Sequence, residues 1–234
     1  MGLEMSQREN KPVHRRSDQR LRRLLWDYGP IGLWLRLRPL RPLLEPERLA
    51  AFIGALAERR HLPGAILEVG CYRGATAAEA SRMLKLWDTQ RRYVCIDTFS
   101  GFVPEQFAQD ELLGLEPSQA HVWDFNSRRA VERTFRHLGH QIDVIEADIV
   151  TSDDGSLPDQ VSVCLLDVDL ESPINAGLEK VYPRMVPGGI VLVDDCEEEG
   201  AWRGARRGYR RFVEGAGLPE TYDSGFGVIE LPGG

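Results

Sequence analysis

From residue 65 onward, short runs of apolar residues alternate with helix-like segments, and this alternation restricts the fold more than any other feature of the chain. The predicted strands are continuously apolar, which is typical of strands buried on both faces of a parallel sheet. The intervening helices supply the crossover connections that parallel strands require. The sequence therefore predicts an α/β protein with a mostly parallel sheet and helices on both faces.

The expected elements follow from this pattern. Strands are predicted at residues 65–69, 92–97, 141–149, 161–169 and 189–195, with an edge strand at 226–231. Helices are predicted at 45–60, 74–86, from Asn126 or Ser127 to 137, directly after 169, and at 201–215. The stretch from 98 to 125, rich in Gly, Pro and acids, is predicted as a loop. Ser172 and Pro173 fit the N-cap and first position of the helix that follows residue 169.

Acidic residues stand where four of the predicted strands end. Asp97, Asp148, Asp167 and Asp194 each fall at a predicted strand C-terminus. An unpaired carboxylate is costly to remove from water, and open parallel sheets bind ligands at the carboxyl ends of their strands. We therefore expect these side chains to converge on one binding site.

Three of the carboxylates form a candidate metal site. Asp167, Asp194 and Asp195 would lie at the tips of two adjacent strands, where they repel one another unless a cation neutralises them. Oxygen ligands suit Mg²⁺ or Ca²⁺ and do not suit zinc. Since Ser172 fits the N-cap, Asp169 has no evident structural role and is a candidate general base. The alternative is that these are solubilising loop acids, with Asp195 capping the next helix.

A glycine motif lies between the first strand and its helix. The stretch "LEVGCYRGAT" reads E-x-G-x-x-x-G, with glycines at 70 and 74 that permit a tight turn and a close ligand. It lacks the second glycine of the dinucleotide-binding pattern. Its spacing resembles the first motif of class I S-adenosylmethionine (SAM) methyltransferases, whose loop faces the methionine end of the cofactor. A purely structural glycine turn is the alternative.

Two of the acids suit a nucleoside cofactor. Asp97 ends the second strand, where a carboxylate can accept hydrogen bonds from two ribose hydroxyls. Asp148, or its neighbouring backbone, could contact the adenine edge. Each could instead be a surface loop acid.

Composition excludes several function classes. The net charge of −7 argues against nucleic acid as the main partner, and no run of 18 or more apolar residues predicts a transmembrane segment. The four cysteines are scattered singly, so neither a zinc site nor a redox motif is indicated. The first 15 residues contain no apolar signal region. We expect a cytoplasmic, reduced protein.

The charge is unevenly spread between an N-terminal arm, residues 1–44, and one domain, residues 45–234. Residues 1–43 hold ten of the 29 Lys and Arg residues and four of the 36 acids. We expect a partly disordered, partly helical arm that packs over the domain or across a dimer. The alternative is an amphipathic helix that contacts anionic lipid or a partner.

Five stretches occur in an order that resembles macrocin O-methyltransferase-like proteins. They are "LEVGCYRGAT", "YVCIDTFSGF", "LLDVDLESP", "VYPRMVPGGIVLVDDC" and "WRGARRGYRRF", and the resemblance covers about residues 45–215. It implies a class I methyltransferase (Rossmann-like) fold with a seven-stranded sheet, and a homodimer. It also implies an enzyme that depends on SAM and a metal and methylates sugar hydroxyls of bacterial natural products.

The resemblance also implies roles for individual residues. Asp167, Asp194 and Asp195 would bind Mg²⁺, and Asp169 would be the catalytic base. The family usually has an aromatic residue and then an acid after its "DVDL" stretch, where this chain has Glu171 and Ser172. The residues implied to contact SAM are Glu68, Val69, Gly70, Cys71, Tyr72, Gly74, Asp97, Thr98, Phe99, Ser100, Gly101, Ser127, Asp148 and Asp167.

The leading hypothesis is an O-methyltransferase, dependent on SAM and Mg²⁺, that acts on a hydroxylated small molecule such as a glycoside. A vicinal diol, in a sugar or a catechol, suits chelation by the metal, so a catechol-type enzyme is one alternative. A metal-independent N- or C-methyltransferase is another. A third is a non-catalytic SAM- or nucleotide-binding module tethered by the basic arm.

Overall fold

The computed structural model, which describes residue 29 and residues 40–233, contains one seven-stranded sheet in the order β3-β2-β1-β4-β5-β7-β6. Neighbouring strands from β3 to β5 run parallel, whereas β7 is antiparallel to both β5 and β6. The expected mostly parallel sheet is confirmed. The strands are β1 Ala65–Val69, β2 Tyr93–Asp97, β3 Asp143–Glu146, β4 Val161–Leu166, β5 Met185–Val193, β6 Tyr222–Asp223 and β7 Phe226–Glu230.

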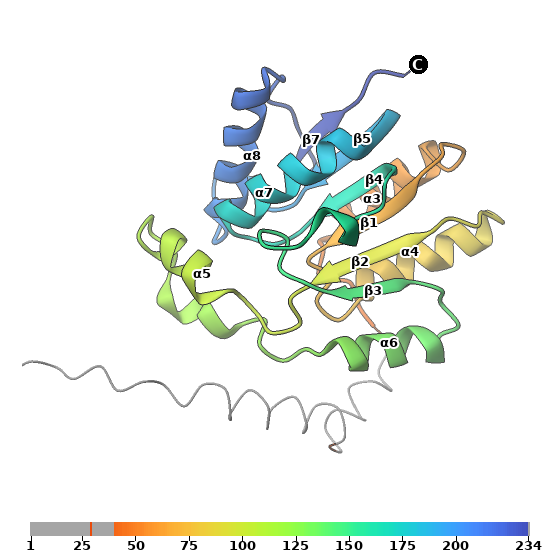
Figure 1. Ribbon diagram of the computed structural model, residues 1–234, viewed down its shortest axis with the longest axis horizontal. Helices are drawn as coiled ribbons and strands as arrows, with labels where there is room; N and C mark the ends of the chain where they lie inside the picture. The colour runs from red at the N-terminus through yellow and green to blue at the C-terminus, as the bar shows by residue number, and fades with distance from the viewer. Residues whose placement is uncertain (1–28, 30–39, 234) are drawn as a thin grey trace, which may run out of the picture.

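Helices cover both faces of the sheet, as expected (Figure 1). Successive residues of a strand point to opposite faces. In β1, Ile66 therefore packs with the core beneath α3, α4 and α6, whereas Leu67 and Val69 pack with the core beneath α7 and α8. None of the helices among the described residues is long and apolar enough to cross a membrane. The helices are α3 Pro46–Glu58, α4 Ala75–Leu86, α5 Pro104–Glu111, α6 Arg128–His137, α7 Glu171–Val181 and α8 Arg203–Ala216.

The segment predicted as a loop between 98 and 125 contains helical structure. It holds α5 and a 3₁₀ turn at Pro117–His121, and both begin with proline in the first turn. Proline is favoured there because its fixed φ suits a helix and its missing N–H would be unpaired anyway. Figure 1 shows α5 beyond the carboxyl ends of the central strands, beside α7. The loop prediction was therefore wrong for these residues.

The predicted start of α7 was also wrong. The helix begins at Glu171, with Leu170 at the N-cap and no cap from its own side chains. The backbone N–H of Glu171 instead donates a 2.8 Å hydrogen bond to Asp110 Oδ2 on α5. Because a residue distant in the sequence fills the capping role, Ser172 and Pro173 lie inside the first turn.

The predicted edge strand is not at the edge. β7 lies between β5 and β6, and the two-residue β6 forms the outer edge. β4 ends at Leu166, so Asp167 and Asp169 stand in the loop that follows it. The expectations for the basic arm fall almost entirely on residues 1–28 and 30–39, outside the described part of the chain.

Candidate functional site

A cavity of about 880 Å³ opens at the carboxyl ends of β1, β2, β4 and β5. This is the rim where ligands bind in open parallel sheets. The acids predicted at the strand ends all face this cavity, so their expected convergence is confirmed. The predicted site residues in its walls are Glu68, Val69, Gly70, Cys71, Tyr72, Asp97, Thr98, Gly101, Asp148, Asp167, Asp169, Asp194 and Asp195.

Four residues implied to contact a cofactor lie outside these walls. Gly74 is the left-handed N-cap of α4, and a Cβ there would lie 2.3 Å from the ring of Phe135. Phe99 is fully buried in the core, and Ser100 does not reach the cavity. The Ser127 hydroxyl caps α6, where it accepts a hydrogen bond from the N–H of Ala130. The capping of α6 is confirmed.

The turn after β1 needs glycine for packing as well as for access. Gly70 has φ of 91°, and a Cβ there would lie 1.7 Å from the carbonyl oxygen of Asp167. The turn therefore rests directly on the chain leaving β4. This close approach explains the glycine whether or not a ligand is bound, and it brings the turn beside the acid-bearing loop.

Glu68 is buried beneath the floor of this turn, with 2% of its surface exposed. The hydroxyl of Tyr93 donates a hydrogen bond to its carboxylate. Burial nevertheless dominates and raises the pKa of Glu68 to about 7. A carboxyl that titrates near neutral pH therefore lies at the base of the cavity.

Asp97 ties the end of β2 to the turn after β1. Its Oδ2 accepts from the N–H of Tyr72 and its Oδ1 from the N–H of Phe99, both at 2.7 Å. Burial raises the pKa of Asp97 to about 6, and these two hydrogen bonds oppose that rise. Each oxygen keeps a further lone pair, so the carboxylate can also accept bonds from a pair of hydroxyls.

Asp148 forms another wall of the cavity. Gln106 of α5 donates through Nε2 to both carboxylate oxygens, at 3.1 and 3.0 Å. The N–H of Val150 donates to Oδ1 at 2.9 Å. The carboxylate thus anchors the turn after β3 to α5, and whether it also contacts a cofactor stays a prediction.

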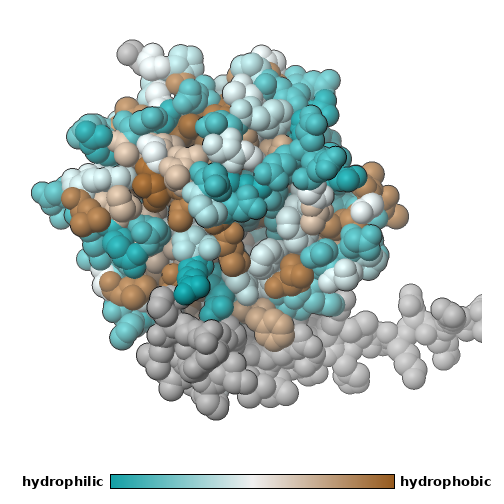
Figure 2. Space-filling view, turned by 180° about the vertical axis from the view of Figure 1, so that it is seen from behind, coloured by the Kyte–Doolittle hydropathy of each residue, from teal (hydrophilic) through white to brown (hydrophobic). Residues whose placement is uncertain are grey.

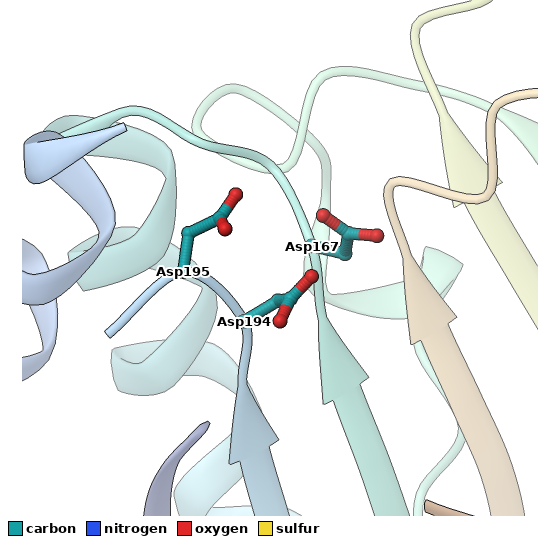
Figure 3. Close-up of side chains that lie close together, drawn as sticks. All are labelled: Asp167, Asp194 and Asp195. Atoms are coloured by element: carbon teal, nitrogen blue, oxygen red, sulfur yellow. The ribbon is translucent and has the colours of Figure 1, made fainter. Parts of the chain in front are cut away.

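The three acids predicted to bind metal form one cluster, defined here as Asp167, Asp194 and Asp195. Each offers an oxygen within 4.8 Å of the others, and Figure 3 shows the side chains gathered at the ends of β4 and β5. Burial and the charge of Asp194 raise the pKa of Asp167 well above its usual value. Burial and the charge of Asp195 raise the pKa of Asp194 to about 6.

The acid cluster has one partner that the sequence did not reveal. Arg48 of α3 donates through Nη1 to Oδ1 of Asp194 and to Oδ1 of Asp195, both at 2.8 Å. Burial alone would lower the pKa of Arg48, but the hydrogen bond to Asp195 and the charge of Asp194 raise it. A single guanidinium thus offsets part of the cluster's negative charge.

The donor set of this cluster fits a hard divalent cation. Among the described residues, no hydrogen-bond donor reaches the carboxylate of Asp167, which lines the cavity and is therefore open to a ligand. Asp194 and Asp195 each keep a second oxygen beyond the one that Arg48 contacts. Among the described residues, three carboxylates face one guanidinium, which leaves excess negative charge, and carboxylate oxygens are the ligands that Mg²⁺ and Ca²⁺ prefer.

Asp169 lies beside the cluster under an aromatic group, defined here as Tyr72, Phe102, Trp123 and Trp202. Trp123 donates through Nε1 to Asp169 Oδ2 at 2.8 Å, and its ring lies 5.0 Å from Tyr72. The ring of Trp202 lies 6.4 Å from Trp123 and 5.4 Å from Phe102. Burial and the charge of Asp195 raise the pKa of Asp169 well above its usual value.

A second cavity of about 210 Å³ shares Asp169 and Trp202 with the first. Its other walls come from α5 and the turn after it, including Asp110 and Gln119, and from α8, including Arg207. The candidate base therefore faces both cavities. The space beyond it is shaped by the segment that the sequence predicted as a loop.

Sequence reasoning missed Arg48, Gln106, Trp123 and Trp202. One of them could have been found from the sequence. Arg48, Phe52 and Leu56 are spaced four residues apart, which places a positively charged side chain on the apolar face of α3. Gln106 follows Pro104 by two residues, and the proline was a helix signal that was not used. The two tryptophans lie in irregular segments, where no periodicity indicates which way a side chain points.

A family model described as macrocin-O-methyltransferase (TylF) matches residues 45–222. Mycinamicin III 3''-O-methyltransferase of Micromonospora griseorubida is 27% identical over 146 residues, covering 59% of this chain and 58% of that protein. A tetracenomycin 4'-O-methyltransferase of Streptomyces olivaceus, named for a dimethoxy-rhamnosyl substrate, is 28% identical over 156 residues, covering 64% and 59%. The chain thus spans less than two thirds of either relative.

Solved structures identify the fold. The O-methyltransferase NovP superposes with a TM-score of 0.68 at 20% identity over 80% of both chains. The calicheamicin methyltransferase CalS11 superposes with a TM-score of 0.62 at 18% identity over 98% of both chains. The expected class I methyltransferase fold is confirmed.

Proposed function

Because the chain belongs to the macrocin-O-methyltransferase (TylF) family, we propose that it is an O-methyltransferase that uses SAM and a divalent cation, Mg²⁺ or another hard ion. Its acceptor would be a hydroxyl on a sugar of a small natural product. The observation that carries the proposal is one cavity that joins the glycine turn after β1, the Asp97 carboxylate and the acid cluster. Each of these parts suits a different component of the reaction.

The cofactor half of the cavity would hold SAM, which supplies an activated methyl group. Asp97 keeps lone pairs for the two ribose hydroxyls, and its existing hydrogen bonds fix its orientation. The turn at Glu68–Tyr72 would bind the methionine end, and Asp148 would lie toward the adenine. Gly70 keeps that turn close to Asp167, so cofactor and acceptor sites adjoin.

The acid cluster would hold the cation. When bound, the ion would act as a Lewis acid that lowers the pKa of a hydroxyl on the acceptor. The carboxylate of Asp167, which has no hydrogen-bond donor within the described part of the chain, and the second oxygens of Asp194 and Asp195 support this role. Two adjacent hydroxyls on the acceptor would suit such a site.

Asp169 would take the proton from the acceptor hydroxyl. Its left-handed backbone, with φ of 63°, and its bond to Trp123 hold the carboxylate in one orientation. Fixing the acceptor oxygen in line with the transferred methyl supplies rate through orientation. The aromatic group would cover the acceptor and exclude water from this space.

A sugar acceptor is supported by the relatives and by the second cavity. The two curated relatives are named for O-methylation of mycinamicin III and of a rhamnosyl-tetracenomycin. The second cavity extends past Asp169, which gives a glycosylated molecule room beyond the reacting hydroxyl. Aromatic rings such as Trp202 offer apolar faces for the C–H surface of a sugar.

The test is methyl transfer from SAM to a panel of acceptors, followed by mass spectrometry. The panel contains glycosylated macrolides, other deoxysugar glycosides and catechols. The proposal predicts methylation of a glycoside that EDTA abolishes and Mg²⁺ restores. Asp169→Asn should lower kcat at least about 100-fold.

Other outcomes would favour the alternatives. Full activity in EDTA would overturn the metal role, and methylation of catechols alone would overturn the sugar acceptor. SAM binding without transfer to any acceptor would support a non-catalytic module.

A further inference from the structure

Arg48 is a buried, positively charged side chain that contacts the acid cluster and comes from a helix, not from the strand ends that carry the acids. It has 6% of its surface exposed and projects from α3, which precedes the sheet in the sequence. Its Nη1 contacts Asp194 and Asp195, and its Nη2 pairs with Glu197 at 2.8 Å. One side chain thus links the first described helix to three acids after β5.

The packing around Arg48 leaves the guanidinium little freedom. Phe52 and Leu56 lie on the same face of α3 and are buried in the core, so the arginine cannot turn to solvent. On the other side, a Cβ at Gly225 would lie 2.7 Å from its Nε. That Nε is buried without a hydrogen-bond partner among the described residues. Burying a donor without a hydrogen bond costs free energy, so the ion pairs made by Nη1 and Nη2 must contribute more than this cost.

The contact atoms show what Arg48 does for the cluster. It uses one oxygen of Asp194 and one of Asp195, and leaves the second oxygen of each unused. Its ion pairs within the described part of the chain are with Asp194, Asp195 and Glu197, and not with Asp167, the third member of the cluster. Without a positive charge here, carboxylates within 4.8 Å of one another would repel strongly in a buried site.

We propose that Arg48 is a resident counter-ion with two effects. It keeps the acid cluster assembled when no divalent cation is bound, and it weakens the binding of that cation. The first effect follows from the ion pairs alone. The second effect rests on the proposed function. A fixed positive charge repels an incoming cation, and it also stabilises the cation-free state. Repulsion and stabilisation each lower the affinity of the acid cluster for the cation.

The first test measures thermal stability in EDTA. Arg48→Gln removes the charge, and Arg48→Lys is the matched control that keeps it. We expect Arg48→Gln to lower Tm by at least about 5 °C, because it leaves the buried carboxylate of Asp194 and the half-buried carboxylate of Asp195 without their cation. We expect Arg48→Lys to lose less. Equal losses in the two variants, or an unchanged Tm in Arg48→Gln, would overturn the counter-ion role.

A triple variant separates lost charge pairing from lost packing. Asp194→Asn and Asp195→Asn, added to Arg48→Gln, neutralise the carboxylates that the arginine offsets. We expect this triple variant to be more stable than Arg48→Gln alone, including the case in which Arg48→Gln does not fold. Additive losses would show that Arg48 acts only through packing and would contradict the proposal.

The second test is calorimetric titration of MgCl₂ into the SAM-free protein. We expect Arg48→Gln to bind Mg²⁺ with a Kd at least about threefold lower than the unmodified protein, since the competing charge is gone. Weaker or unchanged binding in that variant would overturn the second effect. If the unmodified protein binds neither Mg²⁺ nor Mn²⁺, the proposed metal site and the proposed effect on metal affinity are both wrong. The thermal stability of the variants in EDTA still decides whether Arg48 keeps the acid cluster assembled.

Discussion

Asp169 is held by a hydrogen bond that the sequence could not predict. Its carboxylate receives the indole N–H of Trp123, which comes from a segment 46 residues earlier. The left-handed backbone at Asp169 adds a second restraint, since residues other than glycine rarely adopt it. As the proposed general base, Asp169 would then keep a fixed distance to the acceptor hydroxyl, so its restraint would affect the rate more than the binding.

Replacing the indole should therefore affect turnover more than affinity. Trp123→Phe keeps a ring and removes the donor, and we expect kcat to fall about tenfold while KM for the acceptor changes little. Trp202→Phe is the control, because its ring belongs to the same aromatic group without a bond to Asp169. Steady-state kinetics measure both. Equal effects of the two variants on kcat would contradict the positioning role.

The raised pKa of Glu68 predicts that the stability of the chain depends on pH. Its folded pKa of about 7 exceeds its ordinary value, so folding favours its protonated form. Its contribution is therefore fully present below about pH 4.5 and is lost as the pH rises through about 7. The shift corresponds to about 3 kcal/mol at high pH.

We expect Tm in EDTA to fall between about pH 5 and about pH 8, and to fall less in Glu68→Gln, which cannot ionise. Differential scanning calorimetry across this range measures the difference between the two proteins. Other buried carboxyls titrate in both proteins, and because the charge of Glu68 raises the pKa of Asp167, the difference between the curves includes this coupling. Parallel curves would show that Glu68 does not carry the dependence.

The helix α5 organises the segment over the second cavity. Asp110, 2% exposed, accepts the Glu171 N–H at the start of α7 and pairs with Arg207 of α8 at 2.5 Å. A Cβ at Gly204 would lie 2.3 Å from Asp110 Oδ2, so α8 approaches closely here. One carboxylate thus fixes three helices around the proposed acceptor space.

Removing that carboxylate should loosen all three helices. We expect Asp110→Ala to lower the free energy of unfolding by about 2–4 kcal/mol, because it leaves the N-terminus of α7 without its acceptor and Arg207 with Glu171 as its remaining carboxylate partner among the described residues. Glu111→Ala, an exposed neighbour on α5, should change it by less than about 0.5 kcal/mol. Urea unfolding measures both. Similar losses in the two variants would refute the anchoring role.

Element by element, the sequence predicted the parts governed by local pattern. The apolar runs located β1, β2, β4 and β5, and their terminal acids located the rim of the cavity. The start of α7 was wrong because its cap comes from Asp110, far away in the chain. The position of β7 was wrong because the two-residue β6 is too short to leave a pattern, and it makes β7 an inner strand.

In the candidate site, too, the sequence predicted the residues that follow a local pattern and missed those that depend on tertiary contacts. Residues at strand ends, such as Asp97 and Asp194, were found because parallel strands bring their carboxyl ends together. Partners that arrive from other elements, such as Arg48 and Trp123, depend on tertiary packing. No local pattern records that packing, so the acids were predicted and the groups that hold them were not.

In the molecule as a whole, the apolar cores and the strand-end acids of the candidate site lie in different places. The two apolar cores lie on opposite faces of the sheet, whereas the predicted strand-end acids gather at one rim. On the face shown in Figure 2, apolar side chains of the described residues are dispersed among polar ones. The expected homodimer and cytoplasmic location stay predictions. Size-exclusion chromatography with light scattering tests the first.

Every step of the proposed reaction requires that the rim cavity bind SAM. Calorimetric titration of SAM into the protein tests it most directly, with Asp97→Ala as the variant that removes the proposed ribose acceptor. We expect one site per chain with a micromolar Kd, weakened at least about tenfold in the variant, since two hydrogen bonds to a charged group are lost. No heat of binding at hundreds of micromolar SAM, on the order of a millimolar Kd or weaker, would contradict it.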